Sequence, residues 1–496
     1  MAEATAPPSD TAQDAGARAV RNTVVRATSD IAGKVLSFVL FAALARALDQ
    51  SAVGIYFFGL AFVQLAAVPV DLGLDRLLLR RVSEDRSASD DLLWNVLAVK
   101  LALAVPVVPI VILIVNIAGY DSTTRETVYV LAGAMIVEAM SRAMQAVFMA
   151  NERNELLAAY FILQRLVGTA IGLFALAEGY GVVAVAGGYA AGAIVGLVVA
   201  AVLMARRLGF PRLRFDRAGW PKLARTSLPF AVHESFTLLL LKLDAVMLSL
   251  LSTQAAVGRY GVASRLYEST FFITFAITGA VAPMYVYLTR DSTPTVGAVF
   301  ERSIKLSLVA LVPCAVAFAA LSEPLLVLFF GEDFRDAAPT LELLSASAVF
   351  MGVIGLCSTL ISLRMNPVMM VRLTSAMVIL NVIFNLVLQP RYGDRAAAGV
   401  MTGTLLVFTV MAVRTAAGGV GGLPLMRVGA GPMAAGLAML LAVIRVEPLG
   451  LDLVLGLTVY ACVLLLVERL VAPDDLRFAA DLVRSRVLSR RDSTAS

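Results

Sequence analysis

The chain has 496 residues, of which 59% are apolar and only 16% are charged, and its mean hydropathy is +0.84. A soluble domain is about 45–50% apolar and about 25% charged, so this composition excludes a soluble globular protein. We predict an all-α integral membrane protein. The net charge is +5 at pH 7, and the three cysteines show no metal or redox spacing, so we expect neither a metal nor another cofactor.

Fourteen apolar segments are long enough to be transmembrane helices, because about 20 apolar residues cross a bilayer. They lie at 23–47, 54–75, 92–117, 127–149, 157–177, 182–205, 227–250, 257–288, 301–321, 341–363, 369–389, 396–416, 430–445 and 450–468. Residues 1–22 are polar and contain no short apolar region typical of a signal peptide. We expect them to form a disordered cytoplasmic tail that is not cleaved.

The distribution of Lys and Arg predicts the orientation, because these residues are retained on the cytoplasmic side. The two tails and the even-numbered connections are richer in them than the odd-numbered connections. Seven lie between the sixth and seventh segments: Arg206, Arg207, Arg212, Arg214, Arg217, Lys222 and Arg225. We therefore predict cytoplasmic termini, including the tail 469–496, and a cytoplasmic interfacial linker at 206–226 that contacts lipid headgroups and not nucleic acid.

Residues 50–56 (QSAVGIY) and 254–260 (QAAVGRY) are nearly identical although they lie 204 positions apart. We interpret each as the short outer turn that leads into the second helix of a repeated unit. In that turn, Gly54 and Gly258 are predicted to supply backbone freedom, since glycine adopts conformations that other residues avoid. The role predicted for the repeat is structural.

A second match shows how far the repeat extends. YGVVAVAG at 180–187 agrees with YGDRAAAG at 392–399 in five positions, now with an offset of 212. We predict two pseudo-symmetric six-helix lobes, an N-lobe at 23–205 and a C-lobe at 227–416. Two further helices follow within 417–468. Because each lobe has an even number of helices, the lobes are parallel repeats, and a binding site is expected at their interface.

Several ionisable residues lie inside the predicted segments. An intramembrane charge costs about 2.5–3.5 kcal/mol on insertion scales and usually faces a cavity or a partner. The basic candidates are Arg26, Lys34, Arg142, Arg165, Lys242 and Arg265, and the acidic ones are Asp30, Glu138, Glu234, Asp244 and Glu268. We expect them to meet in one central cavity. Guanidinium groups suit phosphate, and the acids would orient the cations or bind H⁺ or Na⁺.

Two simpler interpretations remain open for these charges. Glu138 with Arg142, and Arg265 with Glu268, have the spacing of ion pairs within one helix, which would satisfy both partners locally. Asp71, Asp75 and Arg76 lie near the inner end of the second segment, where they indicate a gate or a helix-end interaction instead of a substrate site.

The sequence contains none of the catalytic motifs that would favour an enzyme. There is no Walker loop, no HExxH, no GxSxG and no Cys/His metal spacing. The longest connection, 322–340, is short for a catalytic loop. We therefore predict a transporter and not an enzyme.

Four stretches of the chain resemble the Wzx-type polysaccharide flippases of the multidrug/oligosaccharidyl-lipid/polysaccharide (MOP) exporter superfamily. They are 45–74, 227–268, 326–344 and 392–406. The resemblance implies a fourteen-helix, two-lobed protein that flips undecaprenyl-pyrophosphate-linked oligosaccharide across the bacterial inner membrane by alternating access, driven by a cation gradient.

The partners implied by this resemblance are a lipid-linked anionic glycan, membrane lipids, H⁺ or Na⁺, and polysaccharide assembly proteins. The resemblance also implies that the cavity cations bind pyrophosphate or an acidic glycan. The last two helices are our candidate for the wall of a groove that holds the lipid tail. A lipid II flippase has the same architecture and remains the main alternative, ahead of a multidrug/cation antiporter and a membrane glycan polymerase.

Overall fold

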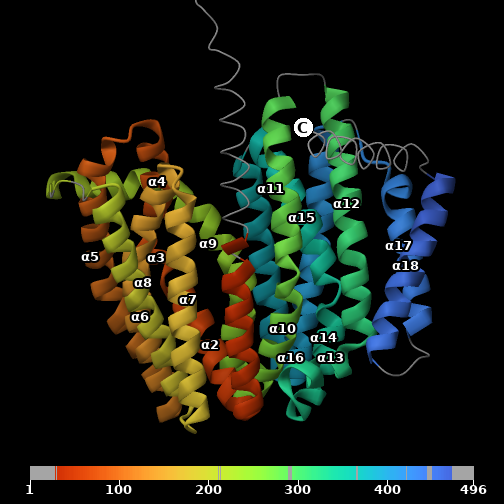
Figure 1. Cartoon of the computed structure of the whole chain (residues 1–496), viewed down its shortest axis with the longest axis horizontal. Coiled ribbons are helices and arrows are strands. Elements are labelled where there is room, and N and C mark those ends of the chain that lie inside the picture. Colours follow the sequence, from red (N-terminus) through yellow and green to blue (C-terminus); the bar gives the residue numbers. More distant parts are fainter. Residues whose placement is uncertain are drawn as a thin grey trace, which may run out of the picture. The chain divides into compact units, whose positions relative to one another are not determined.

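The computed structural model describes residues 28–29, 31–209, 212, 214–288, 293–364, 367–420, 422–443 and 449–471, and all regular secondary structure in these ranges is helical (Figure 1). Nine helices of this part of the chain are long and apolar enough to cross a membrane. The number is ten if the bent pair Glu332–Leu344 and Ser347–Leu363 counts as one span. The protein is therefore an all-α, multi-pass membrane protein, which confirms this part of the predicted fold class.

The predicted number of fourteen spans is larger than this count and stays a prediction. One cause is α16 (Pro367–Gly418), a continuous run of 52 residues that carries two of the predicted segments. Its helical geometry is interrupted at Gly393, where φ is +55°. Glycine tolerates this left-handed conformation without a Cβ penalty, so the chain can bend between the segments 369–389 and 396–416.

The chain divides into two compact units, and each is described separately. Unit 1 contains the described residues up to Val262, together with Phe329–Phe334 and Asn381–Ala397. Its helices are 31–47, α2 (Gln50–Ala66), α3 (Val68–Asp71), α4 (Leu74–Glu84), α5 (Ala88–Ile117), α6 (Ser122–Ala150), α7 (Asn154–Ala177), α8 (Val182–Arg207), η1 (Arg217–Gly219), α9 (Trp220–Leu251) and the first part of α10 (Gln254–Ser269).

Within unit 1, α2, α3 and α6 form the centre and α5 lies at the outside. In the most apolar window of each span, 67% of α2–α3 and 61% of α6 is buried, against 28% of α5. The exposed side chains of α5 include Leu101, Val105 and Ile114. In a membrane protein such a face is covered by lipid, so the central helices α2 and α6 are the ones that can line a protected site.

The second predicted segment, 54–75, is not one continuous helix. α3 ends at Asp71, and the next two residues adopt left-handed backbone angles, with φ of +45° at Leu72 and +74° at Gly73. α4 then begins at Leu74. The break lies between Asp71 and Asp75, so the geometry of both carboxylates depends on it.

The repeated sequences cross each other at the starts of α2 and α10. A Cβ atom on Gly54 would lie 1.9 Å from the Gln254 carbonyl oxygen, and one on Gly258 would lie 2.0 Å from the Gln50 carbonyl oxygen. Both glycines lie inside α-helices, so the prediction that they supply backbone freedom in a turn is wrong. They are needed because the two backbones touch.

The linker after α8 packs on the start of α5 through one buried side chain. Asn95 Nδ2 donates a hydrogen bond to the Arg214 carbonyl oxygen (3.1 Å), and Asn95 Oδ1 accepts from Asp216 N (2.9 Å) and Trp220 Nε1 (3.0 Å). Arg214 also pairs with Asp91 at 2.9 Å. The part of the predicted linker that the structure describes is therefore tied to unit 1.

Unit 2 contains Ala263–Leu328, Arg335–Leu380 and the described residues from Ala398 onward. Its helices are the rest of α10, α11 (Phe271–Leu288), α12 (Thr293–Ala320), α13 (Ser322–Phe330), η2 (Glu332–Ala337), α14 (Ala338–Leu344), α15 (Ser347–Arg364), both ends of α16, α17 (Leu425–Val443) and α18 (Leu449–Val471). The boundary between the units passes through α10, α13, η2 and α16, so the middle of α16, Asn381–Ala397, belongs to unit 1.

The last two helices of unit 2 are fastened to α12 by polar contacts. Lys305 of α12 forms a buried ion pair with Glu468 of α18 at 2.5 Å, and the Tyr460 hydroxyl donates to the Val309 carbonyl oxygen at 3.0 Å. A groove for a lipid tail along these helices stays a prediction.

The borders of the two units differ from those of the predicted lobes. Unit 1 includes α9 and the start of α10, which the sequence repeat assigns to the C-lobe. The lobes at 23–205 and 227–416 therefore stay a prediction. Residues 1–22 and 472–496, which include nearly all of both predicted tails, lie outside the described residues.

Candidate functional site

Glycines bring α7 and α8 into backbone contact. A Cβ atom on Gly192 would lie 2.7 Å from the Gln164 carbonyl oxygen and 2.9 Å from the Gly168 Cα atom. Small residues are typical of membrane helix interfaces, because in lipid the helices gain little from apolar contact and depend on close packing. This packing places Gln164 and Arg165 of α7 and Tyr189 of α8 beside α6.

Glu138 of α6 accepts hydrogen bonds from both neighbouring helices. Gln164 Nε2 donates to Glu138 Oε1 at 3.0 Å, and the Tyr189 hydroxyl donates to the same oxygen at 2.8 Å. The Arg165 guanidinium carbon lies 5.9 Å from the centroid of the Tyr189 ring, within the range of a cation–π contact. The carboxylate is thus oriented by neutral donors, and Arg165 is held against the ring that supplies one of them.

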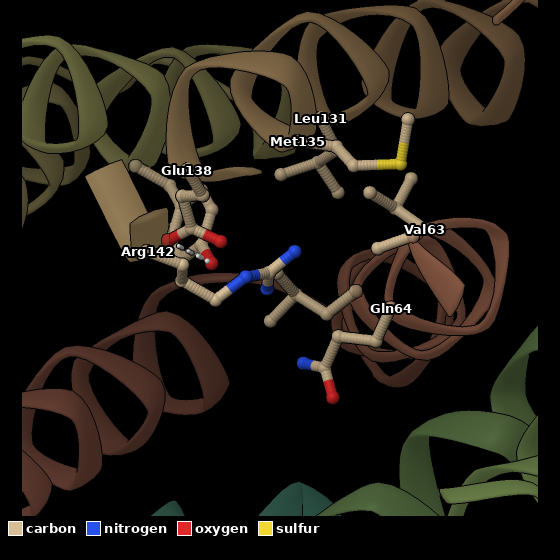
Figure 2. Close-up of a pocket in the computed structure, with 9 residues that line it drawn as sticks. Val63, Gln64, Leu131, Met135, Glu138 and Arg142 are labelled. Atoms are coloured by element: carbon tan, nitrogen blue, oxygen red, sulfur yellow. Dashed lines mark hydrogen bonds between the residues drawn. The ribbon is translucent and has the colours of Figure 1, made fainter. Parts of the chain in front are cut away.

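A small pocket opens beside this carboxylate, between α2, α6 and α8. Its lining residues are Leu60, Val63, Gln64, Ala67, Leu131, Met135, Glu138, Arg142 and Tyr189. Figure 2 shows Glu138 and Arg142 of α6 facing Val63 and Gln64 of α2 across this space. A few convergent polar groups in an apolar wall are typical of a small-molecule site. The Arg142 side chain is 38% exposed, so its guanidinium can meet a ligand.

A buried lysine, Lys100 of α5, lies on the other side of Arg142. Its Nζ atom lies 2.7 Å from Asp71 Oδ1 and 2.5 Å from Asp75 Oδ1, and it donates to the Ala139 carbonyl oxygen at 3.1 Å. The Lys100 side chain is 0% exposed. Asp71 and Asp75 therefore share one interior cation, and the interpretation of these carboxylates as a gate or a helix-end interaction stays a prediction.

Arg142 links the lysine cluster to the pocket. Its Nε atom lies 3.8 Å from Asp75 Oδ2, at the outer limit of an ion pair. Among the described residues Glu138 and Arg142 form no ion pair, so the interpretation that they satisfy each other within α6 is wrong. Each has partners on other helices instead.

A second buried carboxylate, Asp244 of α9, is surrounded by neutral groups. Asn385 Nδ2 donates to Asp244 Oδ1 at 2.6 Å, and the Tyr260 hydroxyl donates to Oδ2 at 3.3 Å. Gln389 Nε2 donates to the Asp244 carbonyl oxygen at 3.2 Å, and the amides of Asn381, Asn385 and Gln389 are bonded in series along α16. Within the part of the chain that the structure describes, no cation pairs with Asp244.

A family model described as polysaccharide biosynthesis protein matches residues 19–288, which is more than half of the chain. The chain belongs to the polysaccharide biosynthesis protein family. The match covers α2, α6 and α8, the three helices that line the pocket, and also α9 with Asp244. Both polar centres of unit 1 therefore lie largely within the family's shared region.

A similar protein from an archaeon is named as a glycan flippase. A Haloferax volcanii protein, named probable low-salt glycan biosynthesis flippase Agl15, is 22% identical over 396 residues, covering 79% of this chain and 82% of that protein. This similarity extends well beyond the 19–288 match.

Solved structures share the fold. The lipid II flippase MurJ in an inward closed conformation matches with a TM-score of 0.74 and 13% identity, covering 93% of this chain and 100% of that one. An inward-facing multidrug resistance MATE transporter of the MOP superfamily matches with a TM-score of 0.64 and 14% identity, covering 79% and 97%. These identities show the fold alone. Together with the family match they confirm the resemblance to polysaccharide flippases of the MOP superfamily.

Among the described residues, the predicted site residues do not all come together in one cluster. Glu138, Arg142 and Arg165 come together around the pocket, and Asp244 forms a separate centre with the amides of α16. Lys34 is exposed on the first helix, and Lys242 is half-buried on α9. That all eleven residues share one cavity stays a prediction.

The remaining candidates lie elsewhere in the chain or beyond its described part. Arg265 and Glu268 lie in unit 2 and pair with each other at 3.7 Å, as the local interpretation expects, and a role for them in substrate binding or coupling stays a prediction. Arg26 and Asp30 lie outside the described residues, as does the side chain of Glu234.

The sequence analysis missed Lys100 and the three amides of α16. Lys100 lies in the predicted segment 92–117, so the rule that selected the other intramembrane charges could have found it. Asn381, Asn385 and Gln389 recur every four residues, which places them on one helix face. That polar stripe was visible, but nothing in the sequence linked it to Asp244.

Proposed function

We propose that this protein flips a lipid-linked oligosaccharide, attached through pyrophosphate to undecaprenol, across the bacterial inner membrane by alternating access. The observation that carries the proposal is the pocket between α2, α6 and α8, where a partly exposed Arg142 faces a space enclosed by membrane helices of a polysaccharide biosynthesis family member. The named function of the Haloferax volcanii relative supports it.

In this proposal Arg142 and Arg165 bind the pyrophosphate or an acidic glycan. A guanidinium group suits phosphate because its planar donors can pair with two oxygens at once. Arg26, Lys34, Lys242 and Arg265 are proposed to serve the same substrate along its path. A transporter and not an enzyme is proposed, in agreement with the flippase and transporter names of the relatives.

Asp244 is proposed as the group that couples transport to a cation gradient. A carboxylate surrounded by amide and hydroxyl groups, with no cation paired to it in the described chain, can accept H⁺ or an alkali ion without displacing a protein partner. Glu138 is proposed to orient Tyr189 and through it Arg165. Asp30, Glu234 and Glu268 are proposed as further orienting or coupling acids.

The proposed architecture has fourteen transmembrane helices in two six-helix lobes plus two C-terminal helices, with both termini in the cytoplasm. The excess of Lys and Arg in the tails and even-numbered connections supports this orientation. Reporter tags at both ends should give a cytoplasmic signal, and an external N-terminus would contradict it. Polysaccharide assembly proteins are proposed as partners.

The test of the substrate site is complementation of a bacterial strain that lacks its O-antigen or capsule flippase. Arg142→Ala and Arg165→Ala should abolish glycan export while the protein stays at wild-type levels in the membrane. The matched control is Arg80→Ala, because Arg80 is 67% exposed and forms only a surface ion pair with Glu84, which contributes little. Full export by both pocket variants would contradict the proposal.

A second candidate function is lipid II flipping, favoured by the fold match to MurJ over 93% of this chain. Both substrates carry a pyrophosphate, so the pocket chemistry alone does not separate them. A strain depleted of its lipid II flippase provides the test. Rescue of that strain only would establish the second candidate, and rescue of the oligosaccharide strain only would establish the first.

A further inference from the structure

We propose that Lys100 is a positioning residue for the pocket: by holding both Asp71 and Asp75, it leaves the Arg142 guanidinium available to an anionic group of the substrate. The inference rests on the proposed function, because it concerns one of the groups assigned to the pyrophosphate. It adds a residue that does not line the pocket and is separated from it by Asp75 and Arg142.

The Lys100 ammonium group donates hydrogen bonds to Asp75 and to the Ala139 carbonyl, and it forms an ion pair with Asp71. An ammonium group has three N–H donors, and Nζ has three close oxygens: Asp71 Oδ1 at 2.7 Å, Asp75 Oδ1 at 2.5 Å and the Ala139 carbonyl at 3.1 Å. Ala139 directly follows Glu138 on α6. Lys100 therefore joins α5 to the two carboxylates and also to the backbone beside the pocket.

The break after α3 gives the two carboxylates their places around this lysine. Asp71 ends α3, and its Oδ2 atom accepts a hydrogen bond from Gly73 N at 3.2 Å. Leu72 has a φ of +45°, a left-handed conformation that is unfavourable for a residue with a side chain and persists only when its surroundings hold it. The contacts of Asp71 and Asp75 with Lys100, one on each side of the break, provide such a constraint.

The charges around Asp75 decide where Arg142 points. Asp75 Oδ1 lies 2.5 Å from Lys100 Nζ, and Asp75 Oδ2 lies 3.8 Å from Arg142 Nε. Lys100 brings one positive charge to two carboxylates, so it weakens the attraction between Asp75 and Arg142 without cancelling it, and a substrate phosphate can compete for the guanidinium. Without Lys100, two carboxylates in a region of low dielectric would lie near the Arg142 guanidinium, and Asp75 would draw that guanidinium out of the pocket.

Two double variants with the same net charge separate positioning from a merely structural role. Lys100→Met/Asp75→Asn removes the lysine and the carboxylate that competes for Arg142. Lys100→Met/Asp71→Asn removes the lysine but keeps Asp75. Each variant loses one cation and one anion from the same buried cluster, so each is the other's control for folding and for charge.

The experiment measures binding of radiolabelled undecaprenyl pyrophosphate to the purified full-length chain in detergent, with uncharged undecaprenol as the control ligand. We expect Lys100→Met/Asp75→Asn to bind within about threefold of wild type. We expect Lys100→Met/Asp71→Asn to bind at least about tenfold more weakly, a factor that corresponds to about 1.4 kcal/mol. Undecaprenol binding should be alike in both, and equal thermal melting and monodisperse elution would confirm that both are folded.

Equal binding by the two double variants, whether weak or like wild type, would overturn the positioning role. Arg142→Ala distinguishes this failure from a failure of the proposed function. If Arg142→Ala loses pyrophosphate binding while the double variants bind alike, only the role of Lys100 is wrong. If Arg142→Ala binds like wild type, Arg142 is not a phosphate ligand, and both proposals fail at this pocket.

Discussion

Unit 1 contains two carboxylate centres with different partners, one that is partly buried and one that is fully buried. Asp71 and Asp75, at the break between α3 and α4, lie against the ammonium group of Lys100 and near the guanidinium of Arg142. Asp244 of α9 receives hydrogen bonds from Asn385 and Tyr260, and within the described chain it has no ion pair. In the first centre the carboxylates lie beside protein cations, and in the second the described partners are neutral amide and hydroxyl groups.

This difference indicates which centre can exchange a cation. A carboxylate paired with a buried lysine would have to lose that partner before it could bind another cation, and breaking a buried pair is costly. Asp244 can gain a proton or a metal ion without losing any protein partner. We therefore propose different tasks for the two centres, positioning for the first and cation exchange for the second, and the following predictions test that assignment.

The largest expected effect is the loss of stability on Lys100→Met. Removing one partner of a buried ion pair costs about 3–5 kcal/mol, because the remaining charge stays buried without compensation. Asp244→Asn keeps the shape and removes a charge that no cation balances, so it should change the free energy of unfolding by less than about 1 kcal/mol. Thermal unfolding in detergent measures the stability of both variants. Equal losses of stability would contradict the proposed difference between the two centres.

The next effect is stabilisation by a bound cation. If Asp244 binds Na⁺, raising NaCl to about 100 times the dissociation constant should stabilise the wild-type protein by about 2.7 kcal/mol relative to choline chloride at equal ionic strength. Asp244→Asn should lose this stabilisation, whereas Lys100→Met/Asp75→Asn should keep it. A Na⁺-dependent shift that survives in Asp244→Asn would place the ion elsewhere.

A smaller loss is expected from Asn385→Leu. Asn385 donates to Asp244 and also bonds Asn381 and Gln389, so its removal leaves buried polar groups without partners at a cost of about 1–3 kcal/mol. Asn116→Leu is the matched control, because Asn116 also bonds side chains of another helix, Tyr129 and Arg125, but it is exposed, so water can replace it as their partner and the expected loss is below about 1 kcal/mol. Equal melting temperatures of the two variants would show that the amides of α16 do not stabilise Asp244.

The smallest effect concerns Glu138, which has neutral donors like Asp244 but lies near the cations of the pocket. Tyr189→Phe removes the hydrogen bond from the Tyr189 hydroxyl to Glu138 and leaves the one from Gln164. The expected loss of stability is about 1 kcal/mol. Pyrophosphate binding should weaken as well, because Arg165 is no longer held beside a ring with a fixed orientation. Unchanged pyrophosphate binding would show that the hydrogen bond between Tyr189 and Glu138 does not contribute to the substrate site.

Much of the fold could be predicted because bilayer insertion depends on composition and segment length. The helices α5, α6, α7, α8, α12, α17 and α18 each contain a predicted apolar segment almost entirely. The prediction failed in detail where backbone geometry was decided by neighbours. Leu72 adopts a left-handed conformation inside the segment 54–75, and an apolar residue of that kind provides no local signal for a break.

The candidate site was predictable only in part. Counting charges inside apolar segments correctly selected Arg142, Arg165, Glu138 and Asp244 as unusual. It did not reveal their partners, since Glu138 and Arg142 have the spacing of an ion pair on one helix but bond to α8 and α4 instead. Spacing along one helix describes which side chains share a face, and partners on other helices depend on how those helices pack.

The repeated QxAVGxY sequence shows the same limit. The sequence by itself determined that the chain is helical, crosses a membrane and contains a repeat with a glycine at the same place in each copy, because hydrophobicity and similarity are properties of the residues alone. Only the tertiary structure decided that Gly54 and Gly258 lie where α2 and α10 touch, and that Lys100 meets Asp71 and Asp75. These contacts join residues far apart along the chain, so they arise only when the helices pack.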